Sequence, residues 1–374
     1  MRKVLICLAL ICLLTLTSCY REVNVNPSDE LINFPVIDII ISNEDYLTLL
    51  SNKIINYEVP CKISYNDKTM WAEIRAAGAG SRYREKWSYT IEIEDGKVFE
   101  GFTKFNFNCQ TYDETMLRSL IALYAYRSAE VYDFMVKHYF LRINGKDHGL
   151  YLQIERIDES YFYRRQIPFW EVYKIGFGTL FTFSETNNPQ FTIDKEIPDN
   201  NNYSTIKELI HACDTSDTEV LVQTFGKFLN LDQYLRYHAI TMIINNMDAF
   251  NNNFLLFKRT PNIPFEVIPW DFDNALSHKV DVPLYGRNRL GEKILSNDSL
   301  RSVYKSFIKQ FITNYYNVEK LFPMIDSLAE TIREPYNLDP YLGNGRFDFN
   351  EEINKLKVLI SNRISYIMEN IDDL

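Results

Sequence analysis

The spacing of apolar residues changes along the chain, and this change limits the folds that the chain can adopt. In the first part, short runs of β-branched and aromatic residues alternate with turn residues, which is typical of β-strands. From about residue 200 onward, apolar residues recur at the spacing of helical turns. The sequence therefore predicts an α+β protein with a β-rich N-terminal lobe over residues 33–160 and a mainly helical C-terminal lobe over residues 161–374.

The predicted elements follow from these two patterns. Strands are expected at Phe34–Ser42, Tyr57–Tyr65, Met70–Ala77, Trp87–Glu94, Lys104–Asn108, Phe134–Ile143 and Gly149–Glu155. Asp95-Gly96 and Asn144-Gly145 are typical of hairpin turns. Thr111 and Glu114 have the spacing of a capping box, so a helix is expected to begin there. Later helices are expected at Tyr203–Ala212, Thr218–Phe228, Leu231–Asn246, Leu300–Tyr315, Val318–Ile332 and Asn350–Ile371, with a hairpin at Phe254–Lys258 and Phe265–Pro269.

The first residues have the features of an export signal. Basic residues precede an apolar stretch, Val4 to Leu16, that is too short to span a bilayer comfortably. The Leu-Thr-Ser-Cys segment at its end resembles a bacterial lipobox, in which Cys19 becomes the lipid-modified first residue. We expect residues 1–18 to be a lipoprotein signal peptide and 19–32 a tether, so that the mature protein is exported and anchored to the cell envelope by lipid alone. The alternative is an ordinary secretory signal with a chance cysteine.

Composition and charge exclude several classes of protein. The chain has 25 tyrosines and 25 phenylalanines, which is too aromatic for a disordered protein. Its net charge of -10 argues against non-specific binding to nucleic acid. The cysteines that lie beyond the signal and the lipid site are Cys61, Cys109 and Cys213, which cannot form a disulfide framework, although one pair could bridge. No Cys/His spacing predicts a zinc site.

The strongest functional pattern combines an acid, an amide and a second acid after a hairpin. Asp248 and Asn253 lie between a predicted helix and a predicted strand, in an Asp-x-x-x-x-Asn spacing. Asp271 and Asp273 follow the hairpin in the segment Pro-Trp-Asp-Phe-Asp. Phosphoryl-transfer enzymes place a base and a divalent metal on residues of these types and at this spacing. The alternative is an Asn-rich turn with a solvated pair of acids.

A glycine-rich turn in the first lobe is a candidate for phosphate binding. Gly78-Ala79-Gly80-Ser81-Arg82 precedes Lys86, and glycines next to basic residues allow a phosphate to approach the backbone closely. The turn does not match a Walker loop. A β-turn with basic surface residues explains the sequence equally well. Arg118 and Glu155 could each be the buried partner of a charged group or be exposed, and the sequence leaves both open.

Several segments together resemble the CotH (spore coat protein H) kinase family of secreted, atypical protein-kinase-like proteins. The segments that carry the resemblance are Gly78–Arg82 with Lys86–Tyr89, Asp113–Arg118, Ile143–Gly145 with Gly149–Tyr151 and Glu155, Tyr173-Lys174, Asn246–Asp248 with Asn253, and Pro269–Asp273. The resemblance runs from about residue 33 to the end. The Trp-Asp-x-Asp core and its spacing are the most specific part.

The resemblance implies a kinase-like fold that uses ATP with Mg²⁺ or Mn²⁺. It makes Asp248 the catalytic base and Asn253, Asp271 and Asp273 the metal residues. It also implies nucleotide contacts, which fall on Lys86, Arg82, Ser81 and Glu155. The chain departs from the family at the turn Arg75–Ser81, where the family more often has Arg-Gly, and this moves the expected phosphate contact toward Arg82 or Arg84. Asn251 and Asn252 stand where the family often has histidine.

Three functions are compatible with these residues. The first is an exported kinase that transfers the γ-phosphoryl group of ATP to a hydroxyl acceptor, such as a protein Ser, Thr or Tyr. The second is a surface binding or adhesion module that keeps the fold without turnover. The third is a metal-dependent hydrolase built on the aspartates, for which His278 is the nearest histidine in the sequence. The presence of Asp248, Asn253 and Asp271 together favours the kinase.

Overall fold

The computed structural model describes residues 31–374 except 32, 79 and 344. The predicted signal peptide, Cys19 and most of the predicted tether lie outside the described residues. Within the described part of the chain, no helix has both the length and the apolar character needed to cross a bilayer. The thiols of Cys61, Cys109 and Cys213 are buried and unbridged.

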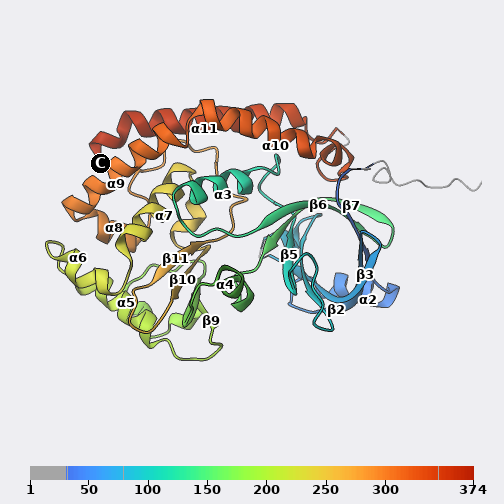
Figure 1. The fold of residues 1–374 in the computed structure, drawn as a ribbon, viewed down its shortest axis with the longest axis horizontal. Helices are drawn as coiled ribbons and strands as arrows, with labels where there is room; N and C mark the ends of the chain where they lie inside the picture. Colours follow the sequence, from blue (N-terminus) through green and yellow to red (C-terminus); the bar gives the residue numbers. More distant parts are fainter. Residues whose placement is uncertain (1–30, 32, 79, 344) are drawn as a thin grey trace, which may run out of the picture.

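The N-terminal part forms a closed β-barrel with the strand order β1-β2-β3-β4-β5-β7-β6 (Figure 1). Its strands are β1 (Val36–Ile40), β2 (Val59–Tyr65), β3 (Lys68–Ala77), β4 (Ser88–Ile93), β5 (Lys104–Asn108), β6 (Val136–Ile143) and β7 (Lys146–Glu155). Neighbours pair antiparallel except β1 and β6, whose parallel pairing closes the barrel. Asn144 and Gly145 both have positive φ, 50° and 74°, so the predicted hairpin turn between β6 and β7 is confirmed.

Alternation along the strands separates the inside of the barrel from its outer face. Ile74, Ile91, Phe105 and Phe107 point inward and belong to one core cluster. Residues between them on the same strands point outward. On β7 the outward-facing Leu152 and its neighbours belong instead to a second core, which fills the C-terminal part. The outer face of this side of the barrel therefore packs against the C-terminal lobe.

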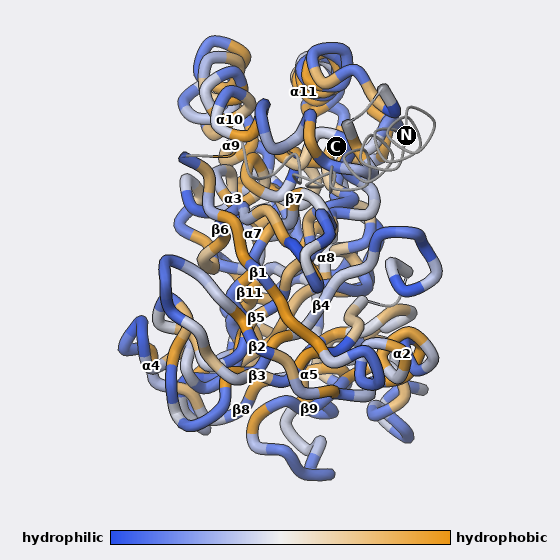
Figure 2. Tube along the Cα trace, turned by 90° about the vertical axis from the view of Figure 1, so that its right-hand side faces the viewer, coloured by the Kyte–Doolittle hydropathy of each residue, from blue (hydrophilic) through white to orange (hydrophobic). Residues whose placement is uncertain are grey.

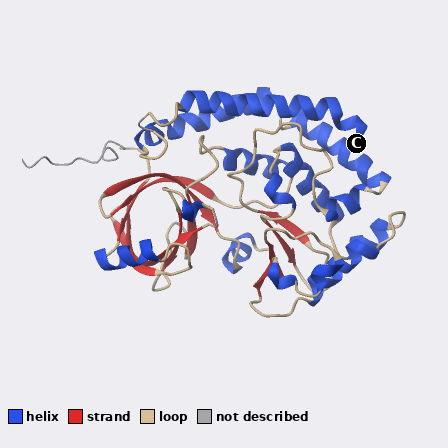
Figure 3. Ribbon diagram, turned by 180° about the vertical axis from the view of Figure 1, so that it is seen from behind, coloured by secondary structure: helices blue, strands red, loops and turns tan. Residues whose placement is uncertain are grey.

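The C-terminal part surrounds a second sheet with the strand order β11-β10-β8-β9 (Figure 3). Its strands are β8 (Glu171–Ile175), β9 (Ile193–Ile197), β10 (Phe254–Lys258) and β11 (Glu266–Pro269). The helices of this part are α4 (Glu159–Arg165), α5 (Ser204–Thr215), α6 (Leu221–Thr224), α7 (Leu231–Ile243), α8 (Arg289–Leu295), α9 (Asp298–Asn314), α10 (Val318–Leu338) and α11 (Phe349–Asn370). Figure 2 shows apolar segments along the strands, with hydrophilic segments in the loops around them.

The fold class predicted from the sequence is confirmed at the level of an α+β protein with a β-rich N-terminal region and a helical C-terminal region. The predicted helix at Thr218–Phe228 is wrong in part, because only α6 is α-helical and a 3-10 turn, Phe225–Lys227, follows it. The sequence patterns also missed α2 (Asn43–Ser51), which packs against β2. The division near residue 160 stays a prediction.

Helix α3 (Arg118–Ser128) shows why the predicted capping box is wrong. The helix begins at Arg118 and not at Thr111, and Leu117 at its N-cap has no side-chain hydrogen bond. The buried carboxylate of Asp113 accepts from the Arg118 N–H at 2.8 Å and from the Thr115 N–H at 2.9 Å, so it satisfies the free amides in place of a capping box. Although α3 lies between β5 and β6 in the sequence, it packs in the C-terminal core.

A buried carboxylate joins the barrel to the last helices. Asp339 ends α10, and its side chain is fully buried. It accepts hydrogen bonds from the Lys86 ammonium at 2.6 Å and from the Leu150 N–H at 2.6 Å, both in the barrel. It also accepts from the N–H groups of Tyr341 at 2.7 Å and Leu342 at 3.0 Å. One side chain thus fixes the end of α10 to β7 and to the segment that precedes β4.

We predict that Asp339→Ala lowers the free energy of unfolding by about 3–5 kcal/mol, because it leaves the Lys86 ammonium and several amides buried without a partner. Urea denaturation of the purified protein measures this. The matched control is Glu85→Ala, which removes a solvent-exposed ion pair with Arg346 and should cost less than about 1 kcal/mol. Equal effects of the two substitutions would contradict the role given to Asp339.

Candidate active site

Helix α7 leads into the loop that positions Asp248. The helix is buried along most of its length and is capped by Asn230. A short 3-10 turn, Met247–Phe250, follows it and contains Asp248. The buried hydroxyl of Tyr237 donates a hydrogen bond to the carbonyl of Ala249 at 2.6 Å. The helix core therefore fixes the backbone next to Asp248.

Asn253 and Asp271 lie at the same end of the β10–β11 hairpin. Phe254 pairs with Pro269, and the Trp270 N–H donates to the Asn253 carbonyl at 3.0 Å. Both Asn253 and Asp271 have left-handed backbones, with φ of 55° and 57°. Asparagine and aspartate tolerate this conformation better than other side chains. The structure thus brings together the amide and the acid that the sequence singles out.

The carboxylate of Asp271 lies in an electrostatically unfavourable environment. Burial raises its pKa to about 6, with Lys174 lowering it and Asp248 raising it. No side-chain hydrogen bond to this carboxylate compensates for its burial among the described residues. Such a carboxylate gains free energy when a cation approaches it. The pKa shift therefore marks Asp271 as a candidate functional group.

Asp273 lies close to the same acids. Burial raises its pKa well above the usual range, and the charges of Asp271 and Asp113 raise it further, while an amide hydrogen bond from Tyr112 acts in the opposite direction. Asp248 also raises the pKa of Asp273. Asp248, Asp271 and Asp273 thus form a cluster of acids that repel one another.

A metal ion would fit this cluster only with help from other ligands. In the described part of the chain, no three His, Cys, Asp or Glu side chains lie close enough together to hold a metal ion by themselves. Mg²⁺ in nucleotide sites usually takes one or two carboxylates and completes its shell with phosphate oxygens and water. Asp271 and Asn253 provide a carboxylate and an amide oxygen at one hairpin end, and this donor set suits such a shared site.

Lys174 is a component of the site that the residue patterns did not identify as functional. It lies on β8 opposite Leu255 of β10, and its charge lowers the pKa of Asp271. Its ammonium has no hydrogen-bond or ion-pair partner among the described residues. In the sequence, the one sign of Lys174 was that Tyr173-Lys174 resembles a segment of the CotH family. A single lysine on a strand belongs to no motif whose spacing could identify it.

Lys86 and Glu155, two of the residues expected to contact the nucleotide, each bind other partners and not one another. The ammonium of Lys86 donates to Asp339 and to the Leu150 carbonyl, each at 2.6 Å. Glu155 is fully buried and forms ion pairs with Arg164 at 2.6 Å and Arg165 at 2.7 Å. Burial raises the pKa of Glu155, but hydrogen bonds led by those from Arg165 outweigh burial and hold the pKa below its usual range.

Ser81 and Arg82 stabilise the glycine-rich turn and its surroundings. The Ser81 hydroxyl donates to the Ala77 carbonyl at 2.9 Å. Arg82 donates to the Ile54 carbonyl at 2.8 Å and to the Asn56 side chain at 2.6 Å. Gly78 has φ of 80°, and a Cβ there would lie 2.5 Å from the Ser81 hydroxyl oxygen. The glycine is therefore required by the close approach within the turn.

A cavity of about 590 Å³ lies between the barrel and the C-terminal lobe. Lys86, Asp113, Arg118 and Asn274 are among the residues that line it. Asn274 donates a hydrogen bond to Asp248 at 3.3 Å, so the candidate base contacts one of the residues that line the cavity. Arg118 is buried and forms an ion pair with Asp113 at 3.5 Å. Of the two alternatives that the sequence left open for Arg118, the structure therefore has the buried partner of a charged group.

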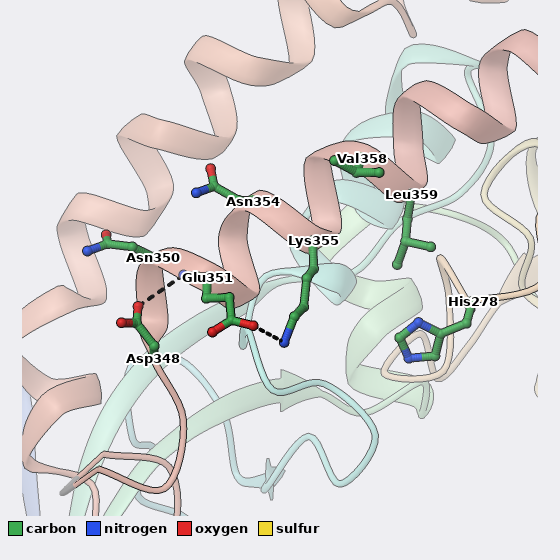
Figure 4. Close-up of a pocket in the computed structure, with 8 residues that line it drawn as sticks. All are labelled: His278, Asp348, Asn350, Glu351, Asn354, Lys355, Val358 and Leu359. Carbon is green, nitrogen blue, oxygen red and sulfur yellow. Dashed lines mark hydrogen bonds and ion pairs between the residues drawn. The ribbon is translucent and has the colours of Figure 1, made fainter.

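A second hollow of about 630 Å³ lies beside the first half of α11 (Figure 4). His278 faces the helix across it, and Glu351 and Lys355 form an ion pair along its wall at 2.8 Å. His278 lines both cavities. None of the predicted site residues lines this second hollow.

The fold and the site together define the class of this molecule. A β-rich N-terminal region, a helical C-terminal region and a loop Asp followed by an Asn and an Asp at one hairpin end are the features of a kinase-like protein. A model of the CotH kinase protein family matches residues 74–367. The chain belongs to this family.

Other comparisons give more distant likenesses. The chain is 24% identical to inner spore coat protein H of Bacillus subtilis (strain 168) over 357 residues, which cover 91% of this chain and 99% of that protein. Among solved structures, the proinflammatory kinase CtkA of Helicobacter pylori matches 85% of this chain and 91% of its own, with 12% identity and a TM-score of 0.34. A chain of the toxin–antitoxin complex of HipA, HipB and operator DNA from Shewanella oneidensis MR-1 matches 90% of this chain and 73% of its own, with 12% identity and a TM-score of 0.37.

We predict that Asp271→Asn makes the metal-free protein more stable at pH 7.5, by roughly 1–2 kcal/mol, because it removes a half-buried and repelled charge. In the folded protein the pKa of Asp271 is about 6, against about 3.9 in an unfolded chain. The wild-type carboxyl therefore takes up its proton in the folded state as the pH falls through 6, and the gain from the substitution should shrink by pH 5. Denaturation in EDTA at both pH values measures this.

The control for this prediction is Asp298→Asn, at a carboxylate that is 89% exposed on α9. Its effect on stability should be small at both pH values. A less stable Asp271→Asn protein at pH 7.5 would show that the carboxylate is structurally satisfied and is not held for a cation.

Proposed function

We propose that this protein is an exported atypical kinase that transfers the γ-phosphoryl group of ATP to a hydroxyl group, on a protein Ser, Thr or Tyr. The observation that supports it most is the joint placement of Asn253 and Asp271 in left-handed positions at one hairpin end, with Asp248 in the preceding loop. Membership of the CotH kinase family agrees with it, and so does the combination of a β-rich N-terminal region with a helical C-terminal region.

Each residue of the site has a role in this proposal. Asp248 would orient the acceptor hydroxyl and accept its proton. Asn253 and Asp271 would hold Mg²⁺ or Mn²⁺, and Asp273 would support Asp271 or join it as a ligand. The metal, when bound, supplies positive charge to the β- and γ-phosphate oxygens. Lys174, whose charge acts on Asp271 and whose ammonium has no hydrogen-bond partner in the described part of the chain, would bind a phosphate oxygen on the same side.

Lys86 has a narrower role than the family resemblance implies. Its ammonium has three N–H donors, and two of them are used by Asp339 and the Leu150 carbonyl. One donor therefore remains for a phosphate oxygen. Glu155 is held by Arg164 and Arg165 and would act through them, as a positioning residue.

We predict metal-dependent transfer of label from γ-labelled ATP by the purified protein without its signal peptide. Asp248→Ala and Asp271→Ala should each lower the rate by about 10²–10⁴-fold, because the first removes the base and the second a metal ligand. Asp298→Ala, at an exposed site, is the matched control and should keep the full rate. EDTA should abolish labelling, and added Mg²⁺ or Mn²⁺ should restore it.

Two outcomes would count against the kinase. Undiminished labelling in Asp271→Ala would remove the metal assignment. Calorimetry without any heat of ATP binding in the presence of Mg²⁺ or Mn²⁺ would favour a binding module that keeps the fold without turnover.

We also propose that the mature protein is anchored to the cell envelope through lipid on Cys19. The support is the short apolar stretch that ends in Leu-Thr-Ser-Cys. Cys19→Ala should abolish incorporation of a labelled fatty acid and release the protein from the membrane fraction. Unchanged lipid labelling in this variant would show that the modification lies elsewhere.

A further inference from the structure

Three arginines gather on the outer face of the barrel near the glycine-rich turn. We call Arg75, Arg82 and Arg156 the arginine cluster. Arg75 lies on β3, Arg82 in the turn that follows it, and Arg156 directly after the end of β7. Arg75 and Arg82 both donate to the Asn56 side chain, at 3.1 Å and 2.6 Å. Two of the three guanidinium groups thus converge on one neutral oxygen.

The cluster holds more positive charge than its surroundings balance. Among the described residues, the carboxylate of Glu58 is the one acid within ion-pair distance, 3.3 Å from Arg75 Nε, and its side chain is 35% exposed. Burial lowers the pKa of Arg75, and the charges of Arg156 and Arg82 lower it further, against an opposing effect of Glu58. The charge of Arg75 therefore lies close enough to those of Arg82 and Arg156 to be repelled by both.

Hydrogen-bond donors of the cluster remain unused. The Nε atoms of Arg82 and Arg156 are buried and have no hydrogen-bond partner among the described residues. Arg156 has no ion pair or hydrogen bond of its side chain to any other described residue. A buried donor without a partner is unfavourable, and like charges held together add to that cost. An anion bound between the arginines would remove both costs.

The position of the cluster connects it to the candidate active site. Arg75 pairs with Thr90, Thr90 with Asn106, and Asn106 with Ile154, so that these residues share the outer face of the barrel. Ile154 packs in the core of the C-terminal lobe. The cluster therefore lies on the face of the barrel that continues into the junction between the lobes.

A chain of packed residues leads from Arg156 to the Pro-Trp-Asp-Phe-Asp segment. Glu155, which precedes Arg156, accepts a hydrogen bond from the Met135 N–H at 2.8 Å. The preceding residue, Phe134, stacks on Phe272 with ring centroids 5.4 Å apart, and Phe272 lies between Asp271 and Asp273. One hydrogen bond and one ring contact thus connect the neighbours of Arg156 to the Pro-Trp-Asp-Phe-Asp segment.

We propose that the arginine cluster binds a diphosphate or triphosphate group, and that in the proposed kinase this group is the phosphate chain of the nucleotide. Guanidinium groups match phosphate oxygens with paired N–H donors, and three of them fit a chain with several oxygens better than a single phosphate. This assignment rests in part on the proposed function, because the nucleotide is the source of the polyphosphate. It places the main phosphate contact on Arg75, Arg82 and Arg156, with Lys86 held by Asp339.

The test measures anion binding separately from catalysis. Calorimetry on the purified protein without its signal peptide uses tripolyphosphate, ATP and AMP, each in EDTA and again with Mg²⁺. Tripolyphosphate and ATP should bind in EDTA, and AMP at least ten-fold more weakly. Arg156→Ala should weaken tripolyphosphate and ATP by ten-fold or more, and it should not lower the melting temperature, since this side chain has no partner to lose. Arg156→Lys should recover part of the affinity.

The matched control is Arg301→Ala, which removes a partly exposed arginine on α9, far from the arginine cluster in the sequence, and should leave all affinities unchanged. Equal tripolyphosphate affinity in wild type and Arg156→Ala would overturn the proposal, and so would the absence of tripolyphosphate binding. If Arg156→Ala does not fold, Arg156→Gln provides the same comparison. A lower melting temperature with unchanged affinity would also overturn the proposal, because Arg156 would then contribute to packing and not to anion binding.

The outcomes also separate this inference from the kinase itself. Asp271→Asn should keep tripolyphosphate binding in EDTA, because that carboxylate is not part of the cluster. Binding of tripolyphosphate without any transfer of label would keep the anion site and refute the kinase. ATP-dependent labelling at a KM unchanged by Arg156→Ala would keep the kinase and refute the anion site. A higher affinity for tripolyphosphate than for ATP would favour a free polyphosphate as the ligand.

Discussion

The buried carboxylate of Asp339 holds the two halves of the molecule in register. It receives hydrogen bonds from the barrel at Lys86 and Leu150 and from its own chain at Tyr341 and Leu342. A buried ion pair adds little net stability over an apolar contact, but it penalises any arrangement that leaves one partner alone. The contact therefore acts mainly on geometry, because it sets how the last helices meet the barrel and hence how wide the cavity between the lobes is. Gly149 is part of the same constraint, since a Cβ there would lie 2.2 Å from the carboxylate.

Much of the fold follows from local sequence signals that agree with one another. The strands of the barrel alternate between an apolar inner face and an outer face, and Asn144-Gly145 has the conformation that its sequence indicates. The long C-terminal helices have a wide apolar stripe and Asn or Asp caps. The start of α3 could not be predicted in this way, because Thr111 and Asp113 both offer a cap and only the buried tertiary contacts favour Asp113.

The candidate site was predictable where its residues are close in the sequence. Asp248, Asn253 and Asp271 are joined by one loop and one hairpin, and local geometry brings the last two together. Lys174 and Asp339 are held there by long-range pairing, one through β8 on β10 and the other through the end of α10. No spacing rule connects such residues, because their distance along the chain has no relation to their distance in space. For the same reason the sequence does not predict that Arg156, which follows β7, lies near Arg75 on β3.

Charge is distributed unevenly over this site, and the distribution limits the ligands that it can accept. The C-terminal lobe contributes acids whose pKa values burial raises, Asp271 and Asp273. The barrel contributes arginines that burial and mutual repulsion destabilise, and Glu58 balances them only in part. A simple anion would satisfy the arginines and be repelled by the acids, and a bare cation would do the reverse. A ligand that presents phosphate oxygens to the barrel and a divalent cation to the hairpin end satisfies both groups at once, and a metal–nucleotide complex has this form.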